Sequence, residues 1–110
     1  MNFITNEKNV KTVDYPEYKF CKLLDEANGC LNGCYMGVLT YTQTDFIQGG
    51  IHEDQEGFYV ISGSGGVLID DTEYPLSTGA CFIIPPGKYH SIKRDVACES
   101  IKLFFFHAAV

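Results

Sequence analysis

Short apolar runs separated by turn residues fill most of this 110-residue chain, and no stretch shows a helical period of useful length. A first run covers 18–24 and ends before Asn28-Gly29. Further runs follow from residue 34 onward, at 34–43, 45–52, 56–62, 67–69, 73–76, 80–84, 90–93 and 100–107. Strands at such regular spacing, without helices between them, predict an all-β sandwich or barrel.

Turn residues divide these runs. The segment Asp70-Asp71-Thr72 predicts a tight hairpin between two of them. We expect Gly63-Ser64-Gly65-Gly66 to form a loop, because four small residues hold a pleated surface poorly. We predict one domain over 1–110, with 1–17 as a peripheral N-terminal segment.

Charge and composition exclude several classes of protein. Fourteen acidic residues oppose eight basic ones, and the net charge of −6 repels a phosphate backbone, so no nucleic-acid partner is expected. No apolar run is long enough to span a membrane, so no membrane partner is expected either. Residues 1–8 lack the apolar core of a signal peptide, and we therefore expect a cytoplasmic location.

The cysteine count argues against a disulfide framework. Five cysteines, an odd number, accompany no secretory signal. Cys30 and Cys34 are expected to be free, partly buried thiols, since their spacing differs from that of zinc ribbons. Cys81 lies in an apolar run and is expected in the core.

One histidine and one glutamate lie at the ends of two predicted strands. His52 precedes Glu56 by four residues, so the two flank a short connection if these strands are neighbours. Because side chains alternate across a strand, Glu56 shares a face with Phe58 and Val60 and is expected to point inward. A carboxylate in a barrel interior is costly unless it is paired or bound to metal.

A third candidate, His90, follows the rigid turn Pro85-Pro86-Gly87, which aims the next strand back across the barrel. Two imidazoles and one carboxylate at one point form a facial triad with open positions. Such a triad suits a divalent transition metal, with Fe(II), Mn(II), Ni(II) and Zn(II) as alternatives. The sequence therefore predicts a metal site on His52, Glu56 and His90, with open positions for substrate or oxygen.

The spacing around these residues resembles the two motifs of the cupin superfamily. The first motif is Gly, five residues, His-x-His, three or four residues, Glu, six residues and Gly. His52 takes the place of its second histidine, and Glu56 and Gly63 follow at the required distances. The second motif is Gly, five residues, Pro, one residue, Gly, two residues and His.

This second motif is matched at every spacing, by Gly79, Pro85, Gly87 and His90. The resemblance covers about two thirds of the chain, from Asp45 to the C-terminus. It implies a double-stranded β-helix, or jelly-roll barrel.

The first motif departs from the family at two positions. Gly50 stands at the first histidine of the pair, and Thr44 stands at the opening glycine. The family's set of three histidines and one glutamate is thereby reduced to His52, Glu56 and His90.

Two other residues are candidates to complete the set. Gln48 lies two residues before Gly50, on the same face of the predicted strand, and can supply an oxygen ligand. His107 ends the last apolar run and is expected to be structural, with orientation toward the cavity as the alternative.

Two functions remain open on the sequence. The first is a metal-dependent enzyme of dioxygenase, isomerase or lyase type, in which Glu56 doubles as a catalytic base if it is loosely ligated. The second is a non-catalytic module that binds a small molecule such as a sugar or an acid, with a degraded metal site. Gly50 favours the second reading, whereas Glu56 and His90 favour the first. Both imply a small-molecule partner.

A homodimer is also expected. A core of this size gains from further burial between copies. Small cupins pair through their sheets or through exchanged N-terminal strands, and the segment 10–24 has no partner within the two motifs.

Overall fold

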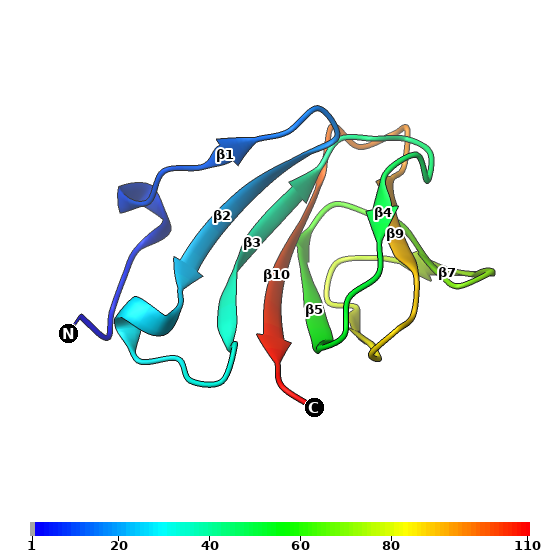
Figure 1. Ribbon diagram of the computed structural model, residues 1–110. Coiled ribbons are helices and arrows are strands. Elements are labelled where there is room, and N and C mark those ends of the chain that lie inside the picture. The colour runs from blue at the N-terminus through cyan, green and yellow to red at the C-terminus, as the bar shows by residue number, and fades with distance from the viewer. Residues whose placement is uncertain (1) are drawn as a thin grey trace.

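The computed structural model describes residues 2–110, which form two antiparallel β-sheets with the hydrophobic core between them (Figure 1). The six-stranded sheet has the order β1 (Val13–Asp14), β2 (Tyr18–Leu24), β3 (Tyr35–Tyr41), β10 (Ile101–Ala108), β5 (Gln55–Ser62) and β8 (Cys81–Ile84). The four-stranded sheet has the order β4 (Gly49–Gly50), β9 (His90–Arg94), β6 (Gly65–Ile69) and β7 (Thr72–Leu76). Single 3-10 turns, η1 (Glu7–Asn9) and η2 (Glu26–Asn28), accompany the N-terminal strands. The all-β jelly-roll prediction is confirmed.

The central strand β10 shows why the chain folds this way. Its buried side chains, Ile101, Leu103, Phe105 and His107, alternate with more exposed ones, so that one face of the strand meets the core. β10 pairs with β3 on one side and with β5 on the other. On β5 the expected face is confirmed, since Glu56, Phe58 and Val60 are all buried.

The residues before β2 are mostly exposed. β1 is exposed and forms the edge of its sheet against β2. β2 in turn pairs with β3 of the same chain, which lies outside the two motifs. Met1, part of the predicted segment 1–17, lies outside the described residues.

The predicted strand 45–52 is wrong in extent and in its neighbours. Only Gly49 and Gly50 form a strand, β4, and it pairs with β9 rather than with β5. The backbone before it is held instead by a buried side chain: Gln43 donates to the carbonyl oxygens of Gln48 at 3.1 Å and Ile92 at 2.7 Å. A side-chain bridge therefore replaces part of the expected ladder.

The predicted loop at 63–66 is also partly wrong, because Gly65 and Gly66 belong to β6. A Cβ on Gly65 would overlap the carbonyl oxygen of Lys93 on β9. The absence of side chains here thus permits a close backbone approach between strands, which local propensity does not reveal.

Two smaller expectations have opposite outcomes. The hairpin at Asp70-Asp71 is confirmed, with Ile69 paired to Thr72 and a positive φ of 52° at Asp70. Cys81 is exposed rather than in the core, because its side chain lies on the outer face of β8.

Within residues 2–110, no helix combines the length and the apolarity that crossing a membrane requires.

Candidate metal centre

Cross-strand register brings two of the polar side chains together. His107 on β10 lies directly opposite Glu56 on β5, and opposite Tyr35 on β3. Residues paired in this way project from the same face of a sheet. The ring of Tyr35 stacks on that of His107, with centroids 4.2 Å apart and an interplanar angle of 12°.

The two cupin-like motifs meet through the backbone. The amide of Gly87, in the turn before β9, donates a hydrogen bond of 2.9 Å to the carbonyl oxygen of His52. Gly87 adopts a φ of 77°, which favours glycine. This bond fastens the loop that carries His52 to the turn that precedes His90.

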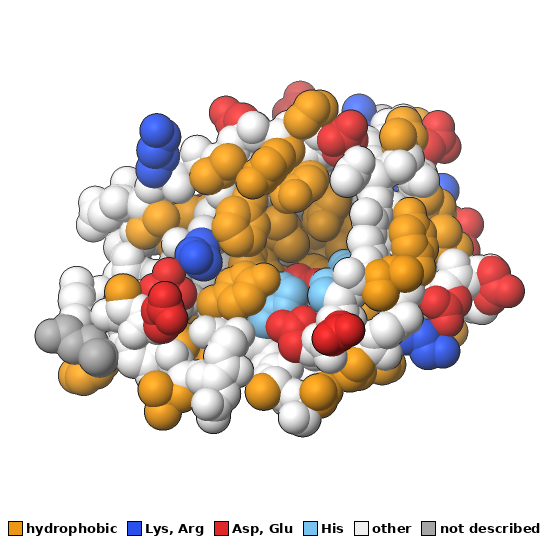
Figure 2. Space-filling view, in the orientation of Figure 1, with side chains coloured by type: hydrophobic (Ala, Val, Ile, Leu, Met, Phe, Trp, Pro, Cys, Tyr) orange, Lys and Arg blue, Asp and Glu red, His pale blue; other side chains and the backbone are white. Residues whose placement is uncertain are grey.

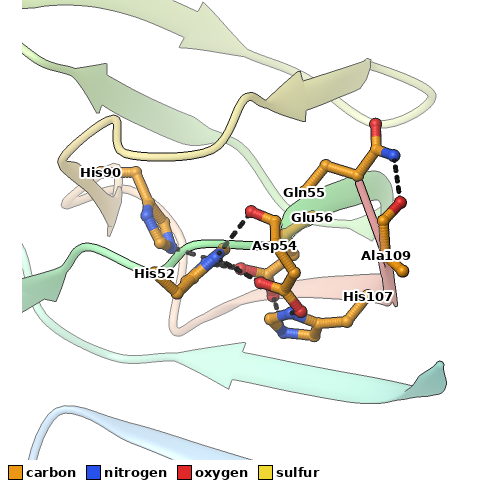
Figure 3. Close-up of polar contacts among 7 residues, drawn as sticks. All are labelled: His52, Asp54, Gln55, Glu56, His90, His107 and Ala109. Carbon is orange, nitrogen blue, oxygen red and sulfur yellow. Dashed lines mark hydrogen bonds and ion pairs between the residues drawn. The ribbon is translucent and has the colours of Figure 1, made fainter. Parts of the chain in front are cut away.

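The side chains of three histidines converge on the carboxylate of Glu56 (Figure 3). Its Oε1 atom lies 2.9 Å from Nε2 of His52 and 3.4 Å from Nε2 of His90. Its Oε2 atom lies 3.1 Å from Nε2 of His107. Ligand atoms of His52, Glu56 and His90 lie within 4.8 Å of one another, close enough for one cation after small adjustments.

Asp54 joins the cluster from the loop before β5. Its carboxylate oxygens lie 2.7 Å from Nδ1 of His52 and 2.8 Å from Nδ1 of His107. His52, Asp54 and His107 form a second group whose ligand atoms lie within 4.8 Å of one another. Asp54 therefore contacts two histidines of the cluster at once.

The surroundings shift the pKa values so as to favour the charged forms of Glu56 and His107 and the neutral form of Tyr35. Burial would raise the pKa of Glu56, but hydrogen bonds and charges from His107 and His90 outweigh it and lower the pKa to about 2. Burial would lower the pKa of His107, yet its hydrogen bonds with Glu56 and Asp54 raise that pKa above its usual value. Burial, together with the charges of Glu56 and Asp54, raises the pKa of the Tyr35 hydroxyl to about 12.

A cavity of about 250 Å³ opens beside these residues. Figure 2 shows the hollow, with hydrophobic side chains on its wall and with histidines and carboxylates at its lower edge. The wall formed by β2, β3 and β10 is largely aromatic and comprises Tyr18, Phe20, Tyr35, Leu39, Tyr41 and Phe105. None of the described residues that line the cavity is Lys or Arg. The site therefore joins a nitrogen and oxygen donor set to an uncharged, aromatic wall.

Gly50 and Gln48 line the opposite side of this cavity. A Cβ on Gly50 would meet no atom within 4 Å, and Gly50 is paired with His90 in the ladder between β4 and β9. The space of the missing histidine is thus open and lies beside His90. Gln48 is exposed at this side of the cavity, and its role as an oxygen ligand stays a prediction.

One donor atom in the cluster lacks a partner. Nδ1 of His90 is buried and has no hydrogen-bond partner among the described residues. The nitrogen and oxygen donors of His52, Glu56 and His90 match the preferences of a divalent transition metal. The residues present therefore fit such an ion.

Comparisons with known proteins agree with this geometry. The family model described as "Cupin domain" matches residues 46–99. The chain carries a cupin domain. A search of curated proteins finds no match.

Several solved structures share the cupin fold of this chain. The polyketide cyclase RemF from Streptomyces resistomycificus has a TM-score of 0.80 and 20% identity, over 97% of this chain and 79% of that one. The Cnp3 cupin domain of Schizosaccharomyces pombe has a TM-score of 0.77 and 20% identity, over 94% of this chain and 71% of that one. Fe(II)-HppE with an alternative substrate, (S)-1-HPP, has a TM-score of 0.79 and 16% identity, over 96% of this chain and 59% of that one.

At these identities the likeness concerns the fold. The cupin domain described here spans less than two thirds of the HppE chain.

Proposed function

We propose that this cupin domain binds one divalent transition metal through His52, Glu56 and His90, and that it holds a small organic molecule in the adjoining cavity. The observation that carries the proposal is the convergence of two Nε2 atoms on one carboxylate oxygen, at 2.9 and 3.4 Å. A buried carboxylate with pKa about 2 is ready to bind a cation. One structural neighbour is an iron protein by its description, Fe(II)-HppE.

The favoured chemistry is that of a metal-dependent enzyme. A divalent ion bound here would supply a Lewis acid next to the cavity. Glu56 is the candidate base if it is only loosely ligated, because it lines the cavity and both of its oxygens contact imidazoles that can pass on a proton. Fe, Mn, Ni and Zn all suit this donor set, and dioxygenase, isomerase and lyase chemistry are all compatible with it.

The cavity favours a small ligand with an apolar or aromatic body. Its volume of about 250 Å³ is at the lower end of ligand pockets, and its wall offers tyrosine and phenylalanine rings. Because none of the described residues that line it is Lys or Arg, an anionic group on the ligand would depend on the metal for charge compensation.

The direct test is elemental analysis of the protein, purified without chelator or affinity tag and then supplemented with Fe(II), Mn(II), Ni(II) and Zn(II) in turn. We expect about one equivalent per chain, and its loss in His90→Ala. No bound metal after supplementation would contradict the proposal.

The alternative is a non-catalytic binding module with a weakened metal site. The open space at Gly50 favours it, because a missing ligand lowers the affinity for metal. Ligand binding measured by calorimetry, with and without a chelator, separates the two functions. Binding that is unaffected by the chelator supports the module, whereas binding that requires metal supports the enzyme.

We also propose that two copies pair through the outer face of the six-stranded sheet. Tyr59, Ile83 and Phe106 lie on this face and are 48%, 47% and 38% exposed. Register places Ile83 and Phe106 on either side of Gly57, which leaves a flat apolar surface suited to a second copy. Light scattering should give twice the 12.3 kDa chain mass, and Ile83→Asp should restore the single-chain mass.

A further inference from the structure

Two side chains outside the proposed ligand set, Asp54 and His107, contact two of its members. Asp54 contacts Nδ1 of His52 at 2.7 Å and Nδ1 of His107 at 2.8 Å. His107 then contacts Oε2 of Glu56 at 3.1 Å, and Oε1 of Glu56 contacts Nε2 of His52 at 2.9 Å. The four side chains thus form a closed ring in which each one uses both of its polar ends (Figure 3).

The ring determines which atoms remain for a metal. Asp54 engages Nδ1 of His52 and His107 engages Oε2 of Glu56, so that Nε2 of His52 and Oε1 of Glu56 face each other in the 2.9 Å contact that a bound metal would replace. These two atoms are the ones that converge with Nε2 of His90, which lies 3.4 Å from Oε1. An oriented histidine of this kind binds metal more tightly, because less ordering remains to be done on binding.

We propose that Asp54 and His107 are positioning residues of the metal centre, which hold Nε2 of His52 and Oε1 of Glu56 toward a common point with His90. This inference rests on the proposed function of that centre. Asp54 acts on His52, His107 acts on Glu56, and the contact between Asp54 and His107 couples the two.

The surroundings of His107 favour positioning over direct coordination. Its Nε2 faces Oε2 of Glu56 and its Nδ1 faces Asp54, whereas the Nε2 atoms of His52 and His90 converge on the other oxygen, Oε1. Its ring is also stacked on Tyr35, and β10 is held between β3 and β5. His107 lines the cavity, but its stacked ring has little freedom to turn toward the point where His52 and His90 converge, whereas its contact with Oε2 of Glu56 needs no movement.

The test measures Co(II) affinity by competition with a chelator, together with the absorption spectrum of the cobalt-saturated protein. Asp54→Asn is the main variant, since the side chain of Asp54 is 31% exposed and the amide has a similar shape. Glu53→Gln is the matched control, because Glu53 is an exposed acid next to Asp54 in the same loop. Unfolding of the metal-free proteins is followed in parallel, to show that each variant is folded.

We expect Asp54→Asn to weaken Co(II) binding by roughly 10–100-fold, as loss of partners behind metal ligands does elsewhere. Glu53→Gln should bind as the wild type does. His107→Gln should retain more affinity than His107→Ala, because its amide can still donate to Oε2 of Glu56. All the variants should keep the wild-type cobalt spectrum at saturation, since the ligands themselves are unchanged.

Two results would overturn this inference while leaving the proposed function intact. If Asp54→Asn and His107→Ala bind Co(II) as tightly as the wild type, the ring has no positioning role. If His107→Ala alters the cobalt spectrum in the way that His90→Ala does, His107 is itself a ligand. A wild-type protein that binds no Co(II), Fe(II), Mn(II), Ni(II) or Zn(II) would instead defeat the proposed function, and this inference with it.

Discussion

Glu56 and His90 face each other across the barrel, yet the two sheets support them very differently. The six-stranded sheet places His107 beside Glu56, and Tyr35 behind His107. In the four-stranded sheet, Nδ1 of His90 has no hydrogen-bond partner among the described residues, and Gly50 lies beside His90.

One side of the site is therefore ordered before any ligand arrives, and the other side has room. An ordered side lowers the cost of binding a metal, because its polar groups need little rearrangement. An open side admits a ligand, or an additional donor, next to His90. The following predictions test this contrast, from the largest expected effect to the smallest.

Glu56→Gln should have the largest effect, because it changes the carboxylate on which three imidazoles converge. The neutral amide attracts a cation less and turns an N–H donor toward at least one imidazole nitrogen. We expect a loss of metal affinity greater than the roughly 10–100-fold that removal of an outer partner costs. Chelator competition measures it, and equal affinity in Glu56→Gln and wild type would remove Glu56 from the ligand set.

Truncation of His107 should cost more stability than truncation of His90 in the metal-free protein. His107→Ala leaves the buried Oε2 of Glu56 without its imidazole donor, a loss of about 1–3 kcal/mol. His90 makes one contact of 3.4 Å with the Glu56 carboxylate, and its Nδ1 makes none with a described residue, so His90→Ala should cost less. Urea unfolding with a chelator present measures both, and the reverse order would contradict the contrast between the sheets.

Alanine substitutions at the adjacent residues Gly49 and Gly50 should affect stability differently, because the first position is crowded and the second is open. A Cβ on Gly49 would overlap the Tyr89 hydroxyl and crowd the carbonyl oxygen of His90, so Gly49→Ala should destabilise by about 1–3 kcal/mol. A Cβ on Gly50 meets nothing within 4 Å, so Gly50→Ala should stay within about 0.5 kcal/mol of wild type. Equal melting temperatures for the two variants would mean that this stretch of backbone is placed differently.

Gly50→His should tighten metal binding, because an imidazole there shares a face with His90 and closes an open position. We expect about a tenfold gain, equivalent to ~1.4 kcal/mol. The same substitution should weaken binding of any ligand that occupies the space beside Gly50. Gly50→Ala is the control, and a folded Gly50→His protein with unchanged metal affinity would show that residue 50 does not face the metal.

The sequence predicts most of the fold because strand periodicity is local. Alternation placed Glu56, Phe58 and Val60 on the buried face of β5, and the acidic turn after Ile69 marked a hairpin. The exceptions lie where a tertiary contact overrides local pattern. Gly65 is in a strand because β9 approaches it closely, and most of 45–52 is not, because the side chain of Gln43 holds that backbone.

In the candidate site, too, local spacing predicts some of the residues and tertiary contacts bring in the others. Motif spacing alone pointed to His52, Glu56 and His90, whose convergence depends on one short loop and one rigid turn, joined by the bond from Gly87 to His52. Asp54 was not assigned to the metal site from the sequence, and His107 was only an alternative candidate to complete the ligand set. A single local signal existed for His107: it falls on the same alternating face as Leu103 and Phe105 and is therefore an inward-pointing histidine.

The sequence by itself determined the all-β class and the identity of the three candidate ligands, because both depend on the spacing of residues that are close together in the chain. Only the tertiary structure decided that His107 lies opposite Glu56 and that Asp54 joins His107 to His52. Glu56 and His107 are brought together by the register of β5 against β10. That register depends on how two whole strands pack against a shared core, and no local pattern in either strand specifies it.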